Sequence, residues 1–312
     1  MMRKLCWQLA LLVLGAAALS PAMAQDELDS GSGMDPAAGV EVWASTDADN
    51  TDVIKILGRA LWDFKGRDKF QGIAVEKAWF KPLGGQTYEA ERVYLDLADS
   101  LGDEWLWRAR IGTDGDTVLG SASIRRRDWR QEFFVEREII ETPLGLENGI
   151  YYTFVGANFD LPVDDSNVFA VMGGVQEFTG DNVRLHARAS YIRALDSDVG
   201  LTAQLRGRYY HSTHPGEFDY FSPRDYGEIL PVLQIRRFDN DGWMYLAAAG
   251  YGVQKATGSD WQAARYANLK IESPRNARRI DAFAEAVYSN NSITGGLNYD
   301  YVLGRAGLTL AF

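Results

Sequence analysis

Residues 183–191 read VRLHARASY, and residues 201–210, after a short interval, read LTAQLRGRYY. Both segments alternate residue by residue between apolar or small side chains and polar ones. A period of two places successive side chains on opposite faces of a β-strand. Segments of this length exceed most strands of soluble proteins. The pattern therefore predicts long strands, each with one apolar face and one polar face.

The same alternation recurs along the chain between turn clusters such as residues 163–167, 196–198, 239–242 and 273–276. Sixteen segments are marked in this way, with fourteen and eighteen as the alternatives. Residues 39–312 then provide about 17 residues for each strand and its connection, which fits strands of roughly ten residues. Counted from a periplasmic N-terminus, the short turns fall on one rim of the sheet. The longer connections, near residues 141–149, 211–226 and 289–299, fall on the other rim, as in outer-membrane barrels.

The end of the chain carries a second signal. Its last residue is Phe312, and Leu310 and Leu308 precede it at alternate positions. This arrangement resembles the carboxy-terminal signal by which the barrel-assembly machinery recognises outer-membrane proteins. A sheet crosses lipid only as a closed barrel, because every backbone polar group must be paired. We therefore predict an all-β fold, a closed antiparallel transmembrane β-barrel of about 16 strands at residues 39–312; the alternative is a soluble β-sandwich.

Residues 1–24 have the three parts of a secretory signal peptide. A positive start with Arg3 and Lys4 is followed by an apolar run over residues 5–19 and by an Ala-Met-Ala cleavage site at 22–24. Residues 25–38 are acidic and rich in Gly and Ser, which predicts a flexible periplasmic arm. Together with the barrel pattern, this leader predicts export to the outer membrane of a Gram-negative bacterium.

Charge and cysteine content exclude several functions. The formal net charge is −11, and it becomes −13 once the leader is removed, so nucleic acid is not an expected partner. The single cysteine, Cys6, lies in the leader, which removes disulfides and thiol catalysis from the mature chain. His211, Ser212 and His214 are neighbours in sequence, but nucleophilic catalysis also needs an oriented base. No enzyme activity, cofactor or metal is predicted.

Assigning the apolar faces to lipid turns a set of arginines toward the lumen. Two interpretations of these charges remain open. They pair with inward acidic residues across the lumen, or they form a basic strip that favours an anionic or hydroxyl-rich solute, because guanidinium groups bind carboxylates bidentately and stack on sugar faces. Aromatic residues near segment ends are expected to form interfacial girdles, with Trp43, Trp62, Trp261, Tyr151 and Tyr209 among them. The inward arginines also include Arg125 and Arg127, and those predicted to line the substrate path are Arg108, Arg110, Arg184, Arg188, Arg206, Arg208 and Arg236.

Residues 207–237 carry a family resemblance. Tyr220-Phe221-Ser222-Pro223, followed by Tyr226 and then Leu230-Pro231-Val232, resembles the carboxy-terminal barrel of exopolysaccharide exporters. These are the outer-membrane subunit of cellulose synthase and the poly-N-acetylglucosamine export porin. The resemblance implies a sixteen-stranded barrel through which polymer passes. Those exporters carry a helical repeat domain before the barrel, and no such repeat exists here, so a separate periplasmic polymer-delivery protein is an expected partner.

These features predict an outer-membrane channel for a polysaccharide-like polymer that performs no covalent chemistry. The inward arginines would hold acidic or hydroxyl groups, and Tyr210, Tyr220 and Phe221 would stack on sugar rings. Outer-membrane lipid, the barrel-assembly machinery and polysaccharide are the other expected partners. The alternatives are a surface receptor or adhesin-type barrel that acts through the loop at residues 211–226, and a general small-solute porin.

Overall fold

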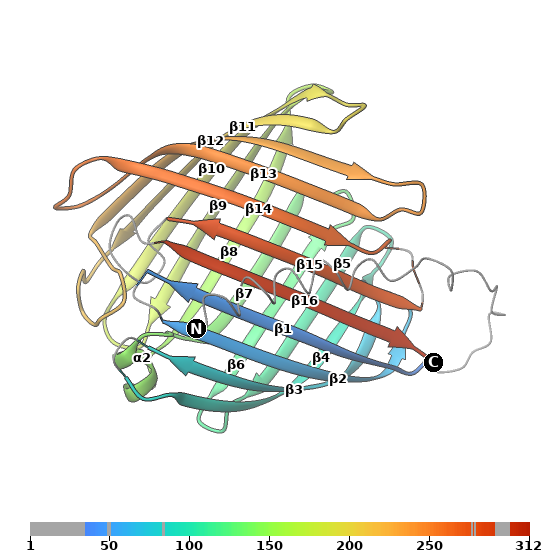
Figure 1. The fold of residues 1–312 in the computed structure, drawn as a ribbon, viewed down its shortest axis with the longest axis horizontal. Coiled ribbons are helices and arrows are strands. Elements are labelled where there is room, and N and C mark those ends of the chain that lie inside the picture. The colour runs from blue at the N-terminus through green and yellow to red at the C-terminus, as the bar shows by residue number, and fades with distance from the viewer. Residues whose placement is uncertain (1–34, 49–50, 83–84, 276, 278, 291–299) are drawn as a thin grey trace.

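The computed structural model describes residues 35–48, 51–82, 85–275, 277, 279–290 and 300–312. These residues form sixteen strands and one short helix (Figure 1). The elements are β1 Ala37–Asp47, β2 Asp52–Phe64, β3 Phe70–Lys81, β4 Tyr88–Leu101, β5 Trp105–Thr113, β6 Val118–Arg126, β7 Gln131–Ile139, α2 Pro143–Asn148, β8 Tyr151–Pro162, β9 Asn167–Phe178, β10 Val183–Asp196, β11 Leu201–Ser212, β12 Asp225–Phe238, β13 Met244–Ala256, β14 Gln262–Glu272, β15 Ile280–Ser289 and β16 Tyr301–Ala311.

The sheet is a closed barrel in which each strand pairs antiparallel with its neighbours in sequence. The first and last strands close it, with a continuous register from Ala37 opposite Ala311 to Asp47 opposite Tyr301. Closure leaves no unpaired strand edge, which is the condition for a sheet in lipid. The predicted barrel and its strand number are therefore confirmed. The first strand begins two residues before the predicted boundary, because Ala37 and Ala38 pair with Leu61 and Ala60. The predicted leader and most of the predicted arm lie outside the described residues.

The two rims of the barrel differ as the sequence predicts. Connections after even-numbered strands are short and lie at the rim of the C-terminus, whereas the opposite rim carries α2 and the residues 213–224 between β11 and β12 (Figure 1). The third long connection, near 289–299, lies almost wholly outside the described residues. The helix α2 was not predicted; Thr142 caps it by accepting a hydrogen bond from Gly145 N, and Gly149 ends it at a φ of 62°.

The outward faces of the strands are apolar. Leu185, Leu205 and Leu233 are each about half exposed on neighbouring strands, and valine, isoleucine and leucine continue this surface around the barrel. Trp62, Trp261 and Tyr209 are exposed among them, as expected for girdle residues. Among the described residues, no helix has the length and hydropathy of a membrane span. A closed barrel with an apolar outer surface is the structure of an outer-membrane protein.

Trp43 is an exception to the predicted girdle. It pairs in register with Lys55 and Arg305, which face the lumen, and the Lys55 ammonium lies 5.7 Å from its ring centroid. The Trp43 side chain therefore points inward. Tyr151 is also buried rather than exposed to lipid, and its hydroxyl donates a hydrogen bond to Asp114 at 2.6 Å. For these two residues the girdle prediction is wrong, because the register turns Trp43 toward Lys55 and because Tyr151 is buried and bonded to Asp114.

Candidate functional site: the lumen wall

The predicted inward arginines lie on the lumen faces of their strands. On β10 and β11, Arg184, His186 and Arg188 pair in register with Ser212, Tyr210 and Arg208. The alternate residues of both strands carry the exposed apolar side chains of the lipid face. The contacts of these arginines divide the lumen wall into two parts of different electrostatic character.

On the wall formed by β1, β2, β4 and β5, charged groups neutralise one another. Asp96 is fully buried and lies 2.6 Å from Arg59 and 2.9 Å from Arg110. Glu41 lies 3.3 Å from Arg59 and 3.4 Å from Arg110. Arg108, at 4.0 Å from Asp96, joins the edge of this cluster. A buried charge is tolerated when its partners are as close as these.

A second group of ion pairs lies on the same side, nearer the α2 rim. Arg92 is buried and lies 2.9 Å from both Glu76 and Glu138. Lys55 lies 2.6 Å from Glu141. For this side of the lumen, the interpretation that inward charges pair with one another is therefore correct, and Arg110 belongs to it.

The wall formed by β10, β11 and β12 is different. In the strand order it stands about opposite β2, β3 and β4. The lumen faces of β10 and β11 carry no carboxylate, and β12 contributes only Glu228. Glu228 lies 3.1 Å from Arg208. Within the described residues, the other arginines of this wall have no carboxylate oxygen within 4 Å; they are Arg184, Arg188, Arg206 and Arg236. We refer to these four and Arg208 as the basic wall.

Neutral groups hold two of these arginines. Arg184 donates from Nε to Ser212 Oγ at 3.2 Å and from Nη2 to the Phe221 carbonyl at 2.6 Å. Arg206 donates from Nε to Gln204 Oε1 at 2.9 Å, and its guanidinium lies 5.1 Å from the Tyr266 ring. Arg188 and Arg236 are exposed. Within the described residues, Arg208 is therefore the one arginine of the basic wall with a carboxylate partner, and the charges of the other four are not neutralised by the protein.

The three predicted aromatic residues lie at the α2 rim of this wall. Tyr210 stacks on Tyr226 with ring centroids 4.8 Å apart, and Arg184 lies 4.5 Å from the Tyr210 ring. Tyr220 stacks on Phe178 at 4.5 Å, and burial raises the pKa of its hydroxyl. Phe221 is half-buried against Tyr226. Tyr210 and Tyr220 are both only 4% exposed, so they pack against protein groups in this structure.

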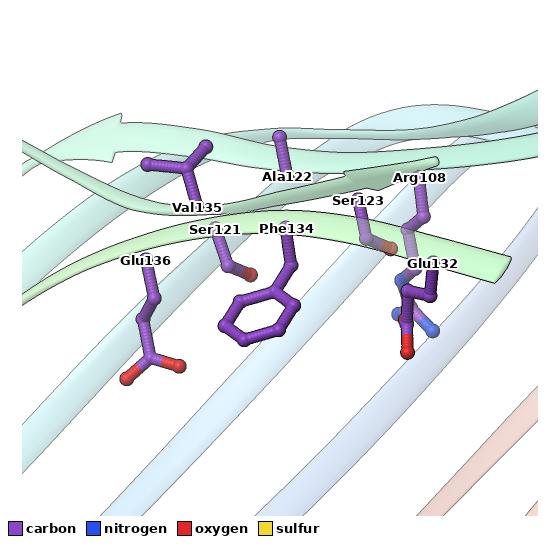
Figure 2. Close-up of a pocket in the computed structure, with 8 residues that line it drawn as sticks. All are labelled: Arg108, Ser121, Ala122, Ser123, Glu132, Phe134, Val135 and Glu136. Carbon is purple, nitrogen blue, oxygen red and sulfur yellow. The ribbon is translucent and has the colours of Figure 1, made fainter. Parts of the chain in front are cut away.

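A pocket of about 250 Å³ opens on the lumen side of β5, β6 and β7 (Figure 2). Figure 2 shows the side chains of Ser121, Ser123 and Phe134 pointing to one side of the sheet, with Glu132 and Glu136 flanking the Phe134 ring. Phe134 is a residue of this site that was not predicted from the sequence. The available signal was its alternation with Phe133 and Val135, which are exposed on the other face.

The neighbouring His211 and Ser212 do not form a catalytic pair. They occupy opposite faces of β11, and His211 Nδ1 lies 2.9 Å from Asp225 whereas Ser212 Oγ accepts from Arg184. His214 Nδ1 lies 2.8 Å from the Asp181 carbonyl. At the other rim, Phe312 is 82% exposed, and Leu310 and Leu308 lie on the exposed outer face. Phe312 therefore contributes little packing to the barrel, whereas Leu308 and Leu310 are more than half covered.

No protein-family model matches the sequence, and no curated protein matches it. Among solved structures, a bacterial polysaccharide outer membrane secretin superposes with a TM-score of 0.61 at 13% identity, over 88% of this chain and 98% of that chain. Pseudomonas aeruginosa OprD gives 0.45 at 10% identity, over 93% of this chain and 99% of its own. A KdgM porin in complex with disordered oligogalacturonate gives 0.38 at 8% identity, over 88% and 99%. The first likeness shows a shared barrel fold.

Proposed function

We propose that the protein is an outer-membrane channel for a polysaccharide-like polymer and that its basic wall contacts acidic or hydroxyl groups of that polymer. The observation that carries this proposal is that, in the part of the chain that the structure describes, no carboxylate pairs with Arg184, Arg188, Arg206 or Arg236. The protein has a net charge of −11, so acidic residues that could neutralise these cations are abundant in its sequence. No carboxylate faces the lumen on β10 and β11, which leaves these guanidinium groups without an acidic partner on their own strands.

The chemistry of the guanidinium group suits such a solute. Its planar set of N–H donors binds a carboxylate through two parallel hydrogen bonds and stacks on flat faces. The basic wall offers several of these groups along three adjacent strands, so a linear polymer would meet them in succession. The carboxylates of the opposite wall, Asp96 and Glu41, are already paired to arginines of that wall, so they do not compete with a solute for the arginines of the basic wall.

The pocket on β5, β6 and β7 suits the hydroxyl groups of a saccharide rather than its acidic groups, because Glu132 and Glu136 line it. Phe134 provides an apolar ring, and Ser121 and Ser123 provide hydroxyls beside it. Aromatic faces with hydrogen-bonding groups nearby are suited to sugar rings, which have an apolar face and a polar edge. The shared fold with a polysaccharide secretin is compatible with this proposal. A separate periplasmic protein that delivers polymer remains part of it.

Transport into liposomes tests the proposal. We expect the purified barrel to admit acidic oligosaccharides faster than neutral ones of the same length. Replacing Arg184, Arg188, Arg206 and Arg208 with Gln should abolish this preference while the barrel still folds. The matched control replaces Arg126, Arg130, Arg193 and Arg237, which lie at the rim or on outward faces, and should retain the preference. A preference that survives the lumen variant would reject the role of the basic wall, and equal passage of both sugars would favour a general porin.

A further inference from the structure

Residues 213–224, which connect β11 to β12, fold back against the α2 rim and are fastened to three neighbouring parts of the barrel. We refer to them as the β11–β12 loop. Their contacts involve the turn between β9 and β10, the start of α2 and the side chain of Arg184. Backbone hydrogen bonds anchor the two ends of the loop, from Thr213 N to the Val183 carbonyl at 2.9 Å and from Ser212 N to the Arg224 carbonyl at 2.8 Å, whereas its middle is held mainly by side-chain contacts.

The first fastening is Glu217. Its carboxylate accepts hydrogen bonds from Asp181 N at 2.7 Å and from Asn182 N at 3.1 Å. Asn182 strengthens the same contact, since its side chain donates to the Tyr220 hydroxyl at 2.9 Å and accepts from His214 N at 3.1 Å. Hydrogen bonds from backbone N–H groups to a carboxylate are among the stronger ones in proteins.

The second fastening is Asp219. Its carboxylate accepts from the Thr142 hydroxyl at 2.6 Å and from Leu144 N at 2.8 Å. Thr142 is the capping residue of α2, so Asp219 ties the loop to the first turn of that helix. Both fastenings are polar contacts at the rim, where water and ions compete for them, and such contacts are suited to reversible opening.

The third fastening differs because its donor is a residue of the basic wall. Arg184 donates to the Phe221 carbonyl, and this loop position covers the Arg184 side chain, which is 8% exposed. Phe221 also packs on a buried cluster of Tyr210, Tyr226 and Ala256. A carbonyl is a weaker partner for a buried guanidinium than a carboxylate is. An acidic group that reached Arg184 would therefore replace Phe221.

Polar atoms beneath the loop also lack partners. The Tyr210 hydroxyl, Arg208 Nε and His186 Nδ1 are buried without a hydrogen bond in the described part of the chain. The residues lie together, because the His186 and Tyr210 rings are 5.6 Å apart and the Tyr210 ring stacks on Tyr226, which bonds Arg208. Buried polar atoms are nearly always hydrogen-bonded. This cluster therefore has hydrogen-bonding capacity that an incoming ligand would use.

We propose that the β11–β12 loop is a lid, closed in this structure, and that an acidic sugar in the lumen opens it by taking Arg184 from the Phe221 carbonyl. The proposal rests on the proposed function, since it needs an acidic saccharide to reach the basic wall. A ligand shifts such an equilibrium only when it binds the open state better. The ligand binds the open state better because, in the closed state, the Phe221 carbonyl of the loop occupies the Arg184 donor that the ligand requires.

A cysteine beneath the lid reports its opening. Ala256 is 5% exposed and belongs to the buried cluster on which Phe221 packs, so Ala256→Cys is a small change at a hidden position. The full chain carries this change together with Cys6→Ser, and a water-soluble maleimide is added to the barrel in liposomes. The rate of labelling then measures how often the loop is open.

Loosening the lid should speed this labelling. Glu217→Gln with Asp219→Asn keeps the size of both side chains but removes the charges that bind the backbone N–H groups, and we expect labelling about tenfold faster. The control is Glu147→Gln with Asp260→Asn, which makes the same change of charge at exposed positions of the same rim. The control should label at the unaltered rate. Equal rates in the two double variants would overturn the lid.

The coupling to cargo needs a second comparison. Tetragalacturonate should accelerate labelling of the Ala256→Cys protein about tenfold, as expected when a charge-assisted bond replaces a neutral one, and maltotetraose should not. Arg184→Gln removes the third fastening and should by itself raise the basal rate of labelling, and on that background the acidic sugar should give no further acceleration. If both sugars accelerated labelling, or if neither did, the claim that an acidic sugar opens the lid would be rejected. The liposome transport assay judges the channel separately, so a barrel that transports acidic sugars without this acceleration rejects the lid alone.

Discussion

Arg188 and Arg208 are direct cross-strand neighbours on β10 and β11, so two guanidinium groups stand side by side on the lumen face. Only Arg208 has an acidic partner, Glu228 at 3.1 Å. Like charges at directly opposed positions of a sheet reduce its stability. A wall that retains this pair sacrifices stability, which is common where a residue serves function.

This pair yields the first prediction. Arg188→Gln should leave the barrel as stable as before or raise its stability by about 0.2–1 kcal/mol, because a like-charge contact is removed. The same change should weaken block of the channel by an acidic oligosaccharide. Arg193→Gln, on the outward face of the same strand, should change neither the stability of the barrel nor the block by the acidic oligosaccharide. Heat modifiability on gels and current recordings measure the two effects, and a loss of stability without loss of block would contradict the assignment.

The paired wall predicts the opposite behaviour. Asp96→Asn removes the carboxylate shared by Arg59 and Arg110 and leaves buried cations short of a partner. Breaking a buried ion pair on one side costs about 3–5 kcal/mol. We expect a clear drop in the denaturant midpoint of the barrel. Lys69→Gln, which breaks a half-exposed pair with Asp99, should cost less than about 1 kcal/mol. Similar losses in both variants would show that the Asp96 cluster is not a structural element.

The turn between β10 and β11 fixes the register of the basic wall. Gly200 has a φ of 69°, and a Cβ there would lie 2.0 Å from the Arg236 carbonyl oxygen. Gly102 has a φ of 62° in a turn of the same rim, but a Cβ there would meet no atom within 4 Å. Both Gly→Ala changes carry a cost of about 1 kcal/mol for the left-handed backbone. Only Gly200→Ala should destabilise the barrel further, and equal unfolding midpoints would refute the close approach.

The terminal residues predict an effect on assembly and not on the folded state. Phe312 is 82% exposed, so Phe312→Ala removes little packing and should leave the unfolding midpoint unchanged. If the assembly machinery recognises this residue, the amount of folded barrel in the outer membrane should fall severalfold. Phe238→Ala, at an exposed aromatic near the same rim, should not reduce that amount. A lower unfolding midpoint together with a normal amount of folded barrel in the membrane would show that Phe312 stabilises the folded state and is not an assembly signal.

The alternation along the chain, together with the turn clusters, was enough to predict about sixteen strands, the short and long rims and the inward direction of the arginines. It could not predict which arginines are paired. Arg110 finds Glu41 and Asp96 on β1 and β4, and these contacts depend on the register of strands distant in sequence. The fastening of the β11–β12 loop was equally hidden, because Glu217 and Asp219 bind backbone groups of other connections.

Short structural elements were also beyond prediction from the sequence. The helix α2 spans six residues, and its capping by Thr142 is visible only together with Asp219 from the loop. Trp43 shows the same limit for a single side chain. Its position near a strand end suited a girdle, but its register places it among the lumen charges beside Lys55.

Single-channel current in a planar bilayer tests the central claim most directly. We predict steady conductance that tetragalacturonate blocks and maltotetraose does not, together with a shift toward cation selectivity when Arg184, Arg188, Arg206 and Arg208 are replaced by Gln. Steady conductance with no block by the acidic sugar, or with the same block in the quadruple variant, would contradict the account.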